Sequence, residues 1–246
     1  IRRRPDDLRA AHRRLRELLR TYGSPSYVSA PVAVRPLGER LIVVRRETYL
    51  RFPDGALTDP NQELWALRED ERGRLRIVLA VNSLAGWLRP ATLAEPAPPE
   101  PAPPEPGAPG DAASLASEME RSFNRRDVAT HYRQLDTPFI RVGDAGAEIF
   151  DDPASGPDLC GSFFTKVDAA GIREVSMIPR AHRYFGAGLE AARVEILATY
   201  EDGHTADPYT EVWVMREVRG ALRVAAIVNP LERRLVDPSF PLRRQP

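Results

Sequence analysis

The chain has 246 residues, and its 35 Lys and Arg are balanced by 35 Asp and Glu, so its formal net charge is zero. That balance gives no argument for a nucleic-acid backbone or an anionic membrane as partner. The longest apolar runs are too short to span a bilayer, and no charged, apolar leader is apparent. The one cysteine, Cys160, cannot form an internal disulfide. It suits a reducing compartment, and we therefore expect a cytoplasmic protein.

In chain order, the first predicted element is a helix over Pro5–Tyr22, whose leucines fall at helical spacing. A meander of strands follows, up to about residue 89. Residues 90 to 111 then read PATLAEPAPPEPAPPEPGAPGD. Proline fixes φ and lacks an N–H donor, so this stretch forms neither helix nor sheet. We expect a solvated, extended spacer that reaches up to roughly 60 Å, with a docking site for a proline-binding module as the alternative.

Residues 112–235 carry a second set of elements, followed by a tail over 236–246. Apolar residues at helical spacing predict a helix over Ala112–Gln134, and a short hairpin around Phe139–Val142 and Glu148–Phe150 follows. A second helix is predicted over Pro157–Ala170, with Gly171 as its stop. Alternating and apolar runs then predict four antiparallel strands: Glu174–Arg183, Leu189–Tyr200, Tyr209–Glu217 and Leu222–Val228.

The two parts match each other. The stretch from Asp54 and the stretch from Asp202 share 14 of 29 aligned positions with one gap, and both run through a Glu-x-Trp pair and a final Val-Asn. This register predicts an internal duplication. The first copy has no counterpart of the long helix and hairpin, so either an upstream segment is missing from this chain or the copy is reduced. An uncovered sheet face would be apolar, and we expect the two copies, or two chains, to cover each other.

The order of long helix, hairpin, second helix and four-stranded meander resembles the SnoaL-like and nuclear-transport-factor-two-like superfamily. Asn124–Val142 (NRRDVATHYRQLDTPFIRV) resembles its opening and Met215–Val228 its closing hairpin. The resemblance covers Ala112–Pro230 well and Pro5–Ser83 in part. It implies an α+β fold of tandem cone-like domains, each a curved antiparallel sheet packed on helices. It implies no single function, because the superfamily holds isomerases, cyclases, dehydratases and interaction domains.

The candidates for a ligand site are weak. Tyr132 falls late in the first helix, where a donor would reach into the cone of domain two. His182 and Tyr184 share one face of a strand, and a neutral histidine there would accept a proton. Each of the three is also explained by an ordinary structural role. Trp213 completes the predicted ligand-binding set, and Cys160 is interpreted as a buried thiol without a partner.

A second candidate set repeats in both copies. Charged residues share strand faces, and each copy places a glutamate two residues before a tryptophan. Such a set could line a pocket, but a cross-strand ion-pair face or an interface between two sheets is the interpretation we favour. The predicted interface residues are Arg45, Glu47, Trp65, Arg193, Glu195 and Trp213.

These patterns predict a protein without metal, nucleotide or other cofactor, since no cysteine or histidine spacing suits a metal and no glycine loop cradles phosphate. The leading hypothesis is a non-catalytic binding or interaction protein. Its partner would be a small apolar molecule held in domain two, or a protein, with pairing through the sheets. The alternative is an isomerase, cyclase or dehydratase acting by acid–base chemistry on a small polycyclic or polyketide-like substrate. The two differ in whether a buried carboxylate or histidine faces an open cavity.

Overall fold

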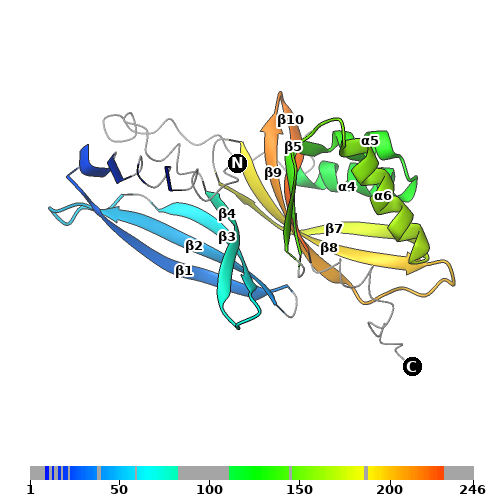
Figure 1. The fold of residues 1–246 in the computed structure, drawn as a ribbon, viewed down its shortest axis with the longest axis horizontal. Helices are drawn as coiled ribbons and strands as arrows, with labels where there is room; N and C mark the ends of the chain where they lie inside the picture. The colour runs from blue at the N-terminus through cyan, green and yellow to red at the C-terminus, as the bar shows by residue number, and fades with distance from the viewer. Residues whose placement is uncertain are drawn as a thin grey trace.

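The computed structural model describes residues 23–82 and 111–229, apart from 38, 39, 59, 144, 145, 186 and 187, with isolated positions between 9 and 21. The tail over 236–246, nearly all of the proline-rich spacer and much of the helix predicted over Pro5–Tyr22 lie outside the described residues. The chain is an α+β protein with two sheets, as the sequence predicts (Figure 1).

The first sheet is a four-stranded antiparallel meander. Its strands follow one another in space in their chain order, β1-β2-β3-β4. β-branched and aromatic residues are frequent in β1 and β2, which suits a pleated, half-buried surface. Their bounds are β1 Ser26–Pro36, β2 Leu41–Arg51, β3 Asn61–Glu69 and β4 Leu75–Asn82.

The second sheet has six strands in the order β6-β5-β10-β9-β8-β7. Four of them form the predicted meander: β7 Ile172–Tyr184, β8 Leu189–Tyr200, β9 Tyr209–Val218 and β10 Ala221–Val228. The predicted hairpin, β5 Leu135–Val142 and β6 Ala147–Phe150, extends this sheet because β5 pairs with β10 in parallel. The sheet is therefore mixed rather than purely antiparallel, and a hairpin distant in sequence closes its edge.

The single helix predicted over Ala112–Gln134 is wrong in one respect, since it is two helices, α4 Ala112–Asn124 and α5 Val128–Arg133. The chain breaks at Arg126, whose φ of 54° is left-handed. Asp127 then starts α5 by accepting a hydrogen bond from the Thr130 backbone N–H at 3.0 Å. An aspartate cap offers the backbone a partner that competes with a continuous helix, and apolar periodicity does not register it.

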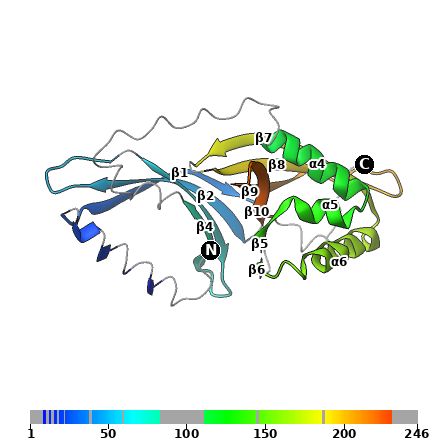
Figure 2. The ribbon, with the colours of Figure 1, turned by 90° about the horizontal axis from the view of Figure 1, so that it is seen from above.

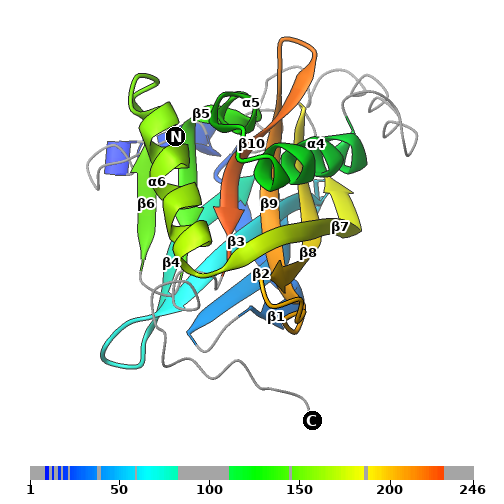
Figure 3. The same ribbon diagram turned by 90° about the vertical axis from the view of Figure 1, so that its right-hand side faces the viewer.

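Helices α4, α5 and α6 (Gly156–Ala169) cover one face of the six-stranded sheet (Figures 2 and 3). The main apolar core lies between them and the strands. It joins helix residues such as Met119 and Phe164 to strand residues such as Val194 and Trp213. Because side chains alternate along a strand, the neighbours of these core residues point to the opposite face of the sheet.

That opposite face meets the four-stranded sheet. A second apolar cluster contains Leu41, Val43 and Leu64 from one sheet and Val142 and Val212 from the other, among others. Val142 has no exposed surface and Val212 keeps only 7%. The two sheets are therefore packed on each other through buried apolar side chains. This contact lies on the side of the six-stranded sheet away from the helices (Figure 1).

The two meanders share their register. Val44 pairs with Trp65 in the four-stranded sheet. Ala192 pairs with Trp213 in the six-stranded sheet, at the positions that the sequence repeat aligns. Irregularities recur at aligned places too, after Pro31 in β1 and after Pro179 in β7. Register is set by which residues a face must bury, so the repeated sequence pattern specifies the same strand pairings twice.

Candidate functional site

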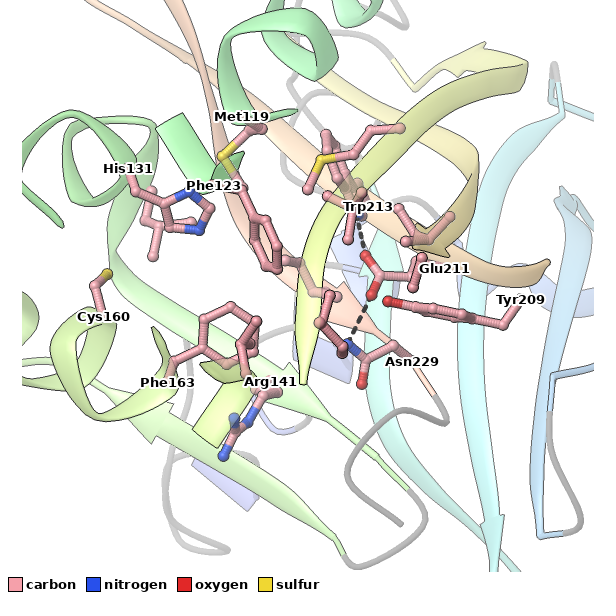
Figure 4. Close-up of a pocket in the computed structure, with 18 of the residues that line it drawn as sticks. Met119, Phe123, His131, Arg141, Cys160, Phe163, Tyr209, Glu211, Trp213 and Asn229 are labelled. Carbon is pink, nitrogen blue, oxygen red and sulfur yellow. Dashed lines mark hydrogen bonds between the residues drawn. The ribbon is translucent and has the colours of Figure 1, made fainter. Parts of the chain in front are cut away.

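A cavity of about 110 Å³ lies between the helices and the six-stranded sheet. Its walls are mostly aromatic and aliphatic side chains from α4, α6 and the strands (Figure 4). The apolar wall includes Met119, Phe123, Phe139, Phe150, Phe163, Ile196 and Trp213. The space between the helices and the six-stranded sheet is therefore not filled by side chains, so the enzyme alternative keeps the open cavity that it requires.

A carboxyl group stands in the wall of this cavity. Glu211 on β9 keeps only 6% of its surface exposed. The Trp213 Nε1–H donates to its Oε2 at 2.6 Å, and the Asn229 Nδ2–H donates to its Oε1 at 2.9 Å (Figure 4). Tyr209 also hydrogen bonds to the carboxylate. Burial nevertheless dominates and raises the pKa of Glu211, because removal from water penalises the ionised form.

An imidazole lines the same cavity from the helical side. His131 on α5 is 6% exposed and packs among aromatic rings, with the Phe164 ring centroid 5.1 Å away. Its Nδ1 lies 3.0 Å from the Ser122 Oγ. Burial lowers the pKa of His131 to about 4, so the ring is neutral at physiological pH. The cavity thus holds a neutral base on one side and a carboxyl on another.

Two further polar groups border the cavity. Arg141 lines it and donates from Nη2 to Glu148 Oε2 at 2.5 Å, with the Phe150 ring centroid 5.8 Å from its guanidinium carbon. Cys160 lines it too, and burial raises the pKa of its thiol to about 11. The interpretation of Cys160 as a buried thiol is confirmed. A thiol with so high a pKa is a poor nucleophile, so it contributes apolar surface.

The structure does not gather the predicted ligand-site residues around the cavity. Trp213 lines the cavity, but Tyr132, His182 and Tyr184 are not among its lining residues. Tyr132 donates to the Pro153 carbonyl at 3.0 Å, and the Tyr184 hydroxyl accepts from the Gly188 N–H at 3.2 Å. The His182 Nε2 lies 2.6 Å from an oxygen of the buried Glu190 on the neighbouring strand. Each of the three therefore has a partner that a structural role explains.

The predicted interface residues divide between the two faces of their sheets. Arg45 and Glu47 lie on the same face of β2 as Val43, and Val43 packs against the six-stranded sheet. Glu47 accepts from Gln62 at 2.8 Å and from Tyr49 at 2.9 Å, and these hydrogen bonds, helped by the charges of Arg45 and Arg183, lower its pKa. Arg183 belongs to the six-stranded sheet, so this charge lies close to the boundary between the sheets.

The other four predicted interface residues do not all lie on the faces where the two sheets meet. Arg193 and Glu195 share the face of Ala191, which packs toward the four-stranded sheet, and Glu195 accepts from Arg180 at 2.7 Å. Trp65 lies on the opposite face of its own sheet, beneath the Arg46 guanidinium, whose central carbon is 3.7 Å from the ring centroid. Trp213 likewise faces the helices. The tryptophans therefore turn away from the contact between the sheets.

Glutamate and tryptophan recur two residues apart in the first domain, with a different partner. Glu63 is 2% exposed and accepts from the Tyr27 hydroxyl at 2.9 Å. Tyr27 comes from β1, whereas the donors to Glu211 come from β9 and from the end of β10. Both glutamates are buried, but their donors come from different elements, and the Glu63 Oε2 has no hydrogen-bond partner among the described residues.

Sequence reasoning did not single out Glu211 and Asn229 as a site. Glu211 belongs to the glutamate–tryptophan pattern for which we favour an interface, and the final Val-Asn of the repeat does not by itself indicate a site. The Asn229 side chain instead bonds the carboxylate. The sequence signal that indicates this site is a glutamate flanked by apolar residues in the strand TEVWVM. A glutamate is almost never fully buried unless it is paired, so a glutamate on an apolar strand indicates a specific partner.

No cluster of three or more histidine, cysteine, aspartate or glutamate side chains suited to a metal occurs among the residues that the structure describes. Within the same ranges, no helix is long and apolar enough to cross a bilayer.

Comparison with known proteins finds matches among solved structures alone. No family model and no curated protein matches the chain. Solved structures that resemble it include an NTF-2-like protein from Shewanella oneidensis MR-1, at 7% identity over 47% of this chain and 93% of that one, with a TM-score of 0.39. A protein with a cystatin-like fold from Nostoc punctiforme PCC 73102 matches at 17% identity over 53% and 91%, with a TM-score of 0.40. A ketosteroid isomerase-like protein from Erwinia carotovora atroseptica SCRI1043 matches at 16% identity over 47% and 89%, with a TM-score of 0.37. Each match spans about half of this chain.

Proposed function

We propose that this protein binds a small, largely apolar molecule inside its second domain. The observation that carries the proposal is the cavity of about 110 Å³ with a buried carboxyl in its wall. An empty apolar space forfeits contacts that a ligand would restore. Apolar walls with a few convergent polar groups are what small-molecule sites have in common.

The remainder of the chain supports a binding role. The sheet face that does not meet the helices packs against the first domain through an apolar cluster that includes Val43, Leu64 and Val214. That packing covers one side of the second sheet and leaves the helical side to form the cavity. The first domain then acts as a support for the pocketed domain, and pairing through sheets and ligand binding are compatible in one chain.

Native mass spectrometry of gently purified protein tests this proposal, with the adduct mass and the oligomer mass measured together. We expect a discrete small-molecule adduct that disappears in Ala206→Phe. Ala206 lines the cavity and is half-buried, so the larger ring enters the space that the ligand would use. Ala181→Phe is the matched control, because Ala181 is exposed on β7 and does not line the cavity. An adduct that survives Ala206→Phe, or no binding by any apolar probe, contradicts the proposal.

A second candidate function is acid–base catalysis on the bound molecule. It is favoured by one observation, the burial of Glu211 and the raised pKa that burial gives its carboxyl. A raised pKa brings a carboxyl closer to the range in which it can act as a general acid or base at physiological pH. In this candidate Glu211 replaces Tyr132, His182 and Tyr184 as the acting group, because those three do not line the cavity.

Exchange of carbon-bound hydrogen tests catalysis without knowledge of the substrate. Single-ring ketones are incubated with the protein in D₂O, and deuterium at the carbon beside the carbonyl is followed by NMR. Catalysis predicts faster exchange with the wild type than with Glu211→Gln, and Glu195→Gln as control should exchange like the wild type. Equal exchange in all three proteins would leave a binding protein that does no chemistry on such ketones.

A further inference from the structure

The size of the cavity limits its ligand. An enclosed apolar space of about 150 Å³ is known to hold one benzene ring. The cavity here measures about 110 Å³. It therefore suits one ring with few substituents.

The walls favour a flat ring over a flexible chain. The Phe123 and Phe163 ring centroids lie 5.9 Å apart at an interplanar angle of 66°, and the Phe139 and Phe150 centroids lie 6.0 Å apart at 26°. All four rings line the cavity. Aromatic rings at these separations interact best with another ring that stacks offset or meets them edge to face.

The polar end of the cavity offers acceptors. An ionised carboxylate has about four lone-pair sites. Trp213, Asn229 and Tyr209 occupy three of those on Glu211, which leaves capacity for one more donor. Beside it, the buried Asn229 Oδ1 has no hydrogen-bond partner within the described part of the chain. The hydrogen-bonding sites that lack a partner at this end of the cavity are therefore acceptors.

The Glu211 carboxyl also limits the charge that a ligand in this cavity can carry. An anionic ligand would place a second negative charge beside Glu211, where little water screens the repulsion. A cationic ligand would have to leave water for a largely apolar space. A neutral hydroxyl avoids both costs and supplies the donor.

We propose that the ligand is a neutral single-ring molecule carrying a hydrogen-bond donor, of the phenol or ring-alcohol class, with its hydroxyl directed at Glu211. The ring lies among the phenylalanines, and the hydroxyl takes the remaining acceptor site on the carboxylate. This inference rests on the proposed binding function and adds the chemistry of the ligand to it.

Phenol and toluene test the inference, because they have nearly the same size and differ by a hydroxyl in place of a methyl group. Affinities for the wild-type protein are measured by calorimetry or by ligand-observed NMR. A plain apolar cavity would prefer toluene, since a hydroxyl without a partner is costly to bury. We expect phenol to bind roughly tenfold or more tightly than toluene, as for a hydrogen bond to a charged group.

The outcomes separate this inference from the function on which it rests. Toluene binding as well as phenol or better would overturn the donor assignment and leave an apolar binding pocket. Binding of 2-naphthol but not of phenol would overturn the size assignment and again leave the pocket. Binding of none of the three would count against the pocket as a binding site.

Glu211→Gln provides the matched variant, because it keeps the size of the side chain and removes the charge. We expect the advantage of phenol over toluene to fall towards unity in this variant. Glu195→Gln, on the other face of the six-stranded sheet, should keep the wild-type ratio. If Glu211→Gln does not fold, the ratio of the two ligands on the wild type still decides the matter. An unchanged ratio in a folded Glu211→Gln would overturn the role given to the carboxylate.

Discussion

Acidification below neutrality should destabilise the protein through His131. The pKa of this buried imidazole falls from 6.5 to about 4 on folding, chiefly because burial penalises the charged ring. Below pH 6.5 the unfolded chain takes up a proton that the folded chain refuses until about pH 4. The stability that the neutral ring contributes is therefore present above pH 6.5 and is lost as the pH falls towards 4.

The size of this loss follows from the shift. At about 1.4 kcal/mol per pKa unit, the difference corresponds to about 3 kcal/mol of unfolding free energy between pH 6.5 and pH 4. That is a large fraction of the stability of an ordinary domain. Ser122, the neighbour of His131, also donates to the Met119 carbonyl at 2.9 Å, so loss of the imidazole does not leave the hydroxyl unpaired. His131→Phe is consequently a suitable variant for a site surrounded by rings.

Urea denaturation at pH 7, 6, 5 and 4.5 measures the effect. Glu211 titrates with the opposite sign, because its raised pKa makes the ionised folded form costly as pH increases. The quantity to compare is therefore the wild type minus His131→Phe, in which the carboxyl contributions cancel. We expect this difference to fall by about 3 kcal/mol across the range. Parallel curves for His131→Phe would refute the buried, neutral imidazole.

Three further outcomes are expected. In urea unfolding, Gly161→Ala in α6 should stabilise the protein by up to about 1 kcal/mol, since a Cβ there meets nothing within 4 Å. Gly156→Ala should instead destabilise it by about 1–3 kcal/mol, because a Cβ at Gly156 would lie 2.0 Å from an aromatic ring. Val224→Asp should lower the unfolding free energy by more than about 4 kcal/mol, because Val224 has no exposed surface, while Ile77→Asp at the aligned position, 53% exposed, should change it by less than about 1 kcal/mol. Cys160, with a pKa of about 11, should react with iodoacetamide at pH 8 far more slowly in the folded protein than in urea, and equal rates would contradict its burial.

Local signals in the sequence located most of the strands. The period-two alternation over Leu189–Tyr200 predicts β8 with the bounds that the structure shows. The Asp-Gly pairs mark the hairpin turns, and Gly55 and Gly203 have φ of 87° and 85°. A left-handed backbone conformation favours glycine, which has no Cβ, so a glycine in the sequence indicates where the turn lies.

Such local signals do not predict which strand the β5–β6 hairpin pairs with. Its β5 joins β10 in parallel, across more than eighty residues of chain. A strand carries its alternation wherever it pairs, and nothing in that alternation specifies which edge receives it. The break between α4 and α5 depends on a single capping aspartate, Asp127, which the longer apolar period conceals.

The candidate site also combines features that the sequence determines with features that only the tertiary structure decides. Residues 209–215 read YTEVWVM, and this pattern determines that Glu211 and Trp213 share one face while Val212 and Val214 share the other. It does not determine which face meets helices and which meets the other sheet. Only the tertiary structure put Glu211 in a cavity wall and Val212 between the sheets.

The sequence by itself determined the elements, their turns and the repeated strand register, because these follow from backbone chemistry and from alternation within a few residues. The cavity was decided by the tertiary structure. Its volume is what remains when α4, α5 and α6 come to rest on the strands, and that distance depends on side chains from many parts of the chain packing at once. The pKa shifts of Glu211 and His131 depend on the same packing, since burial causes both.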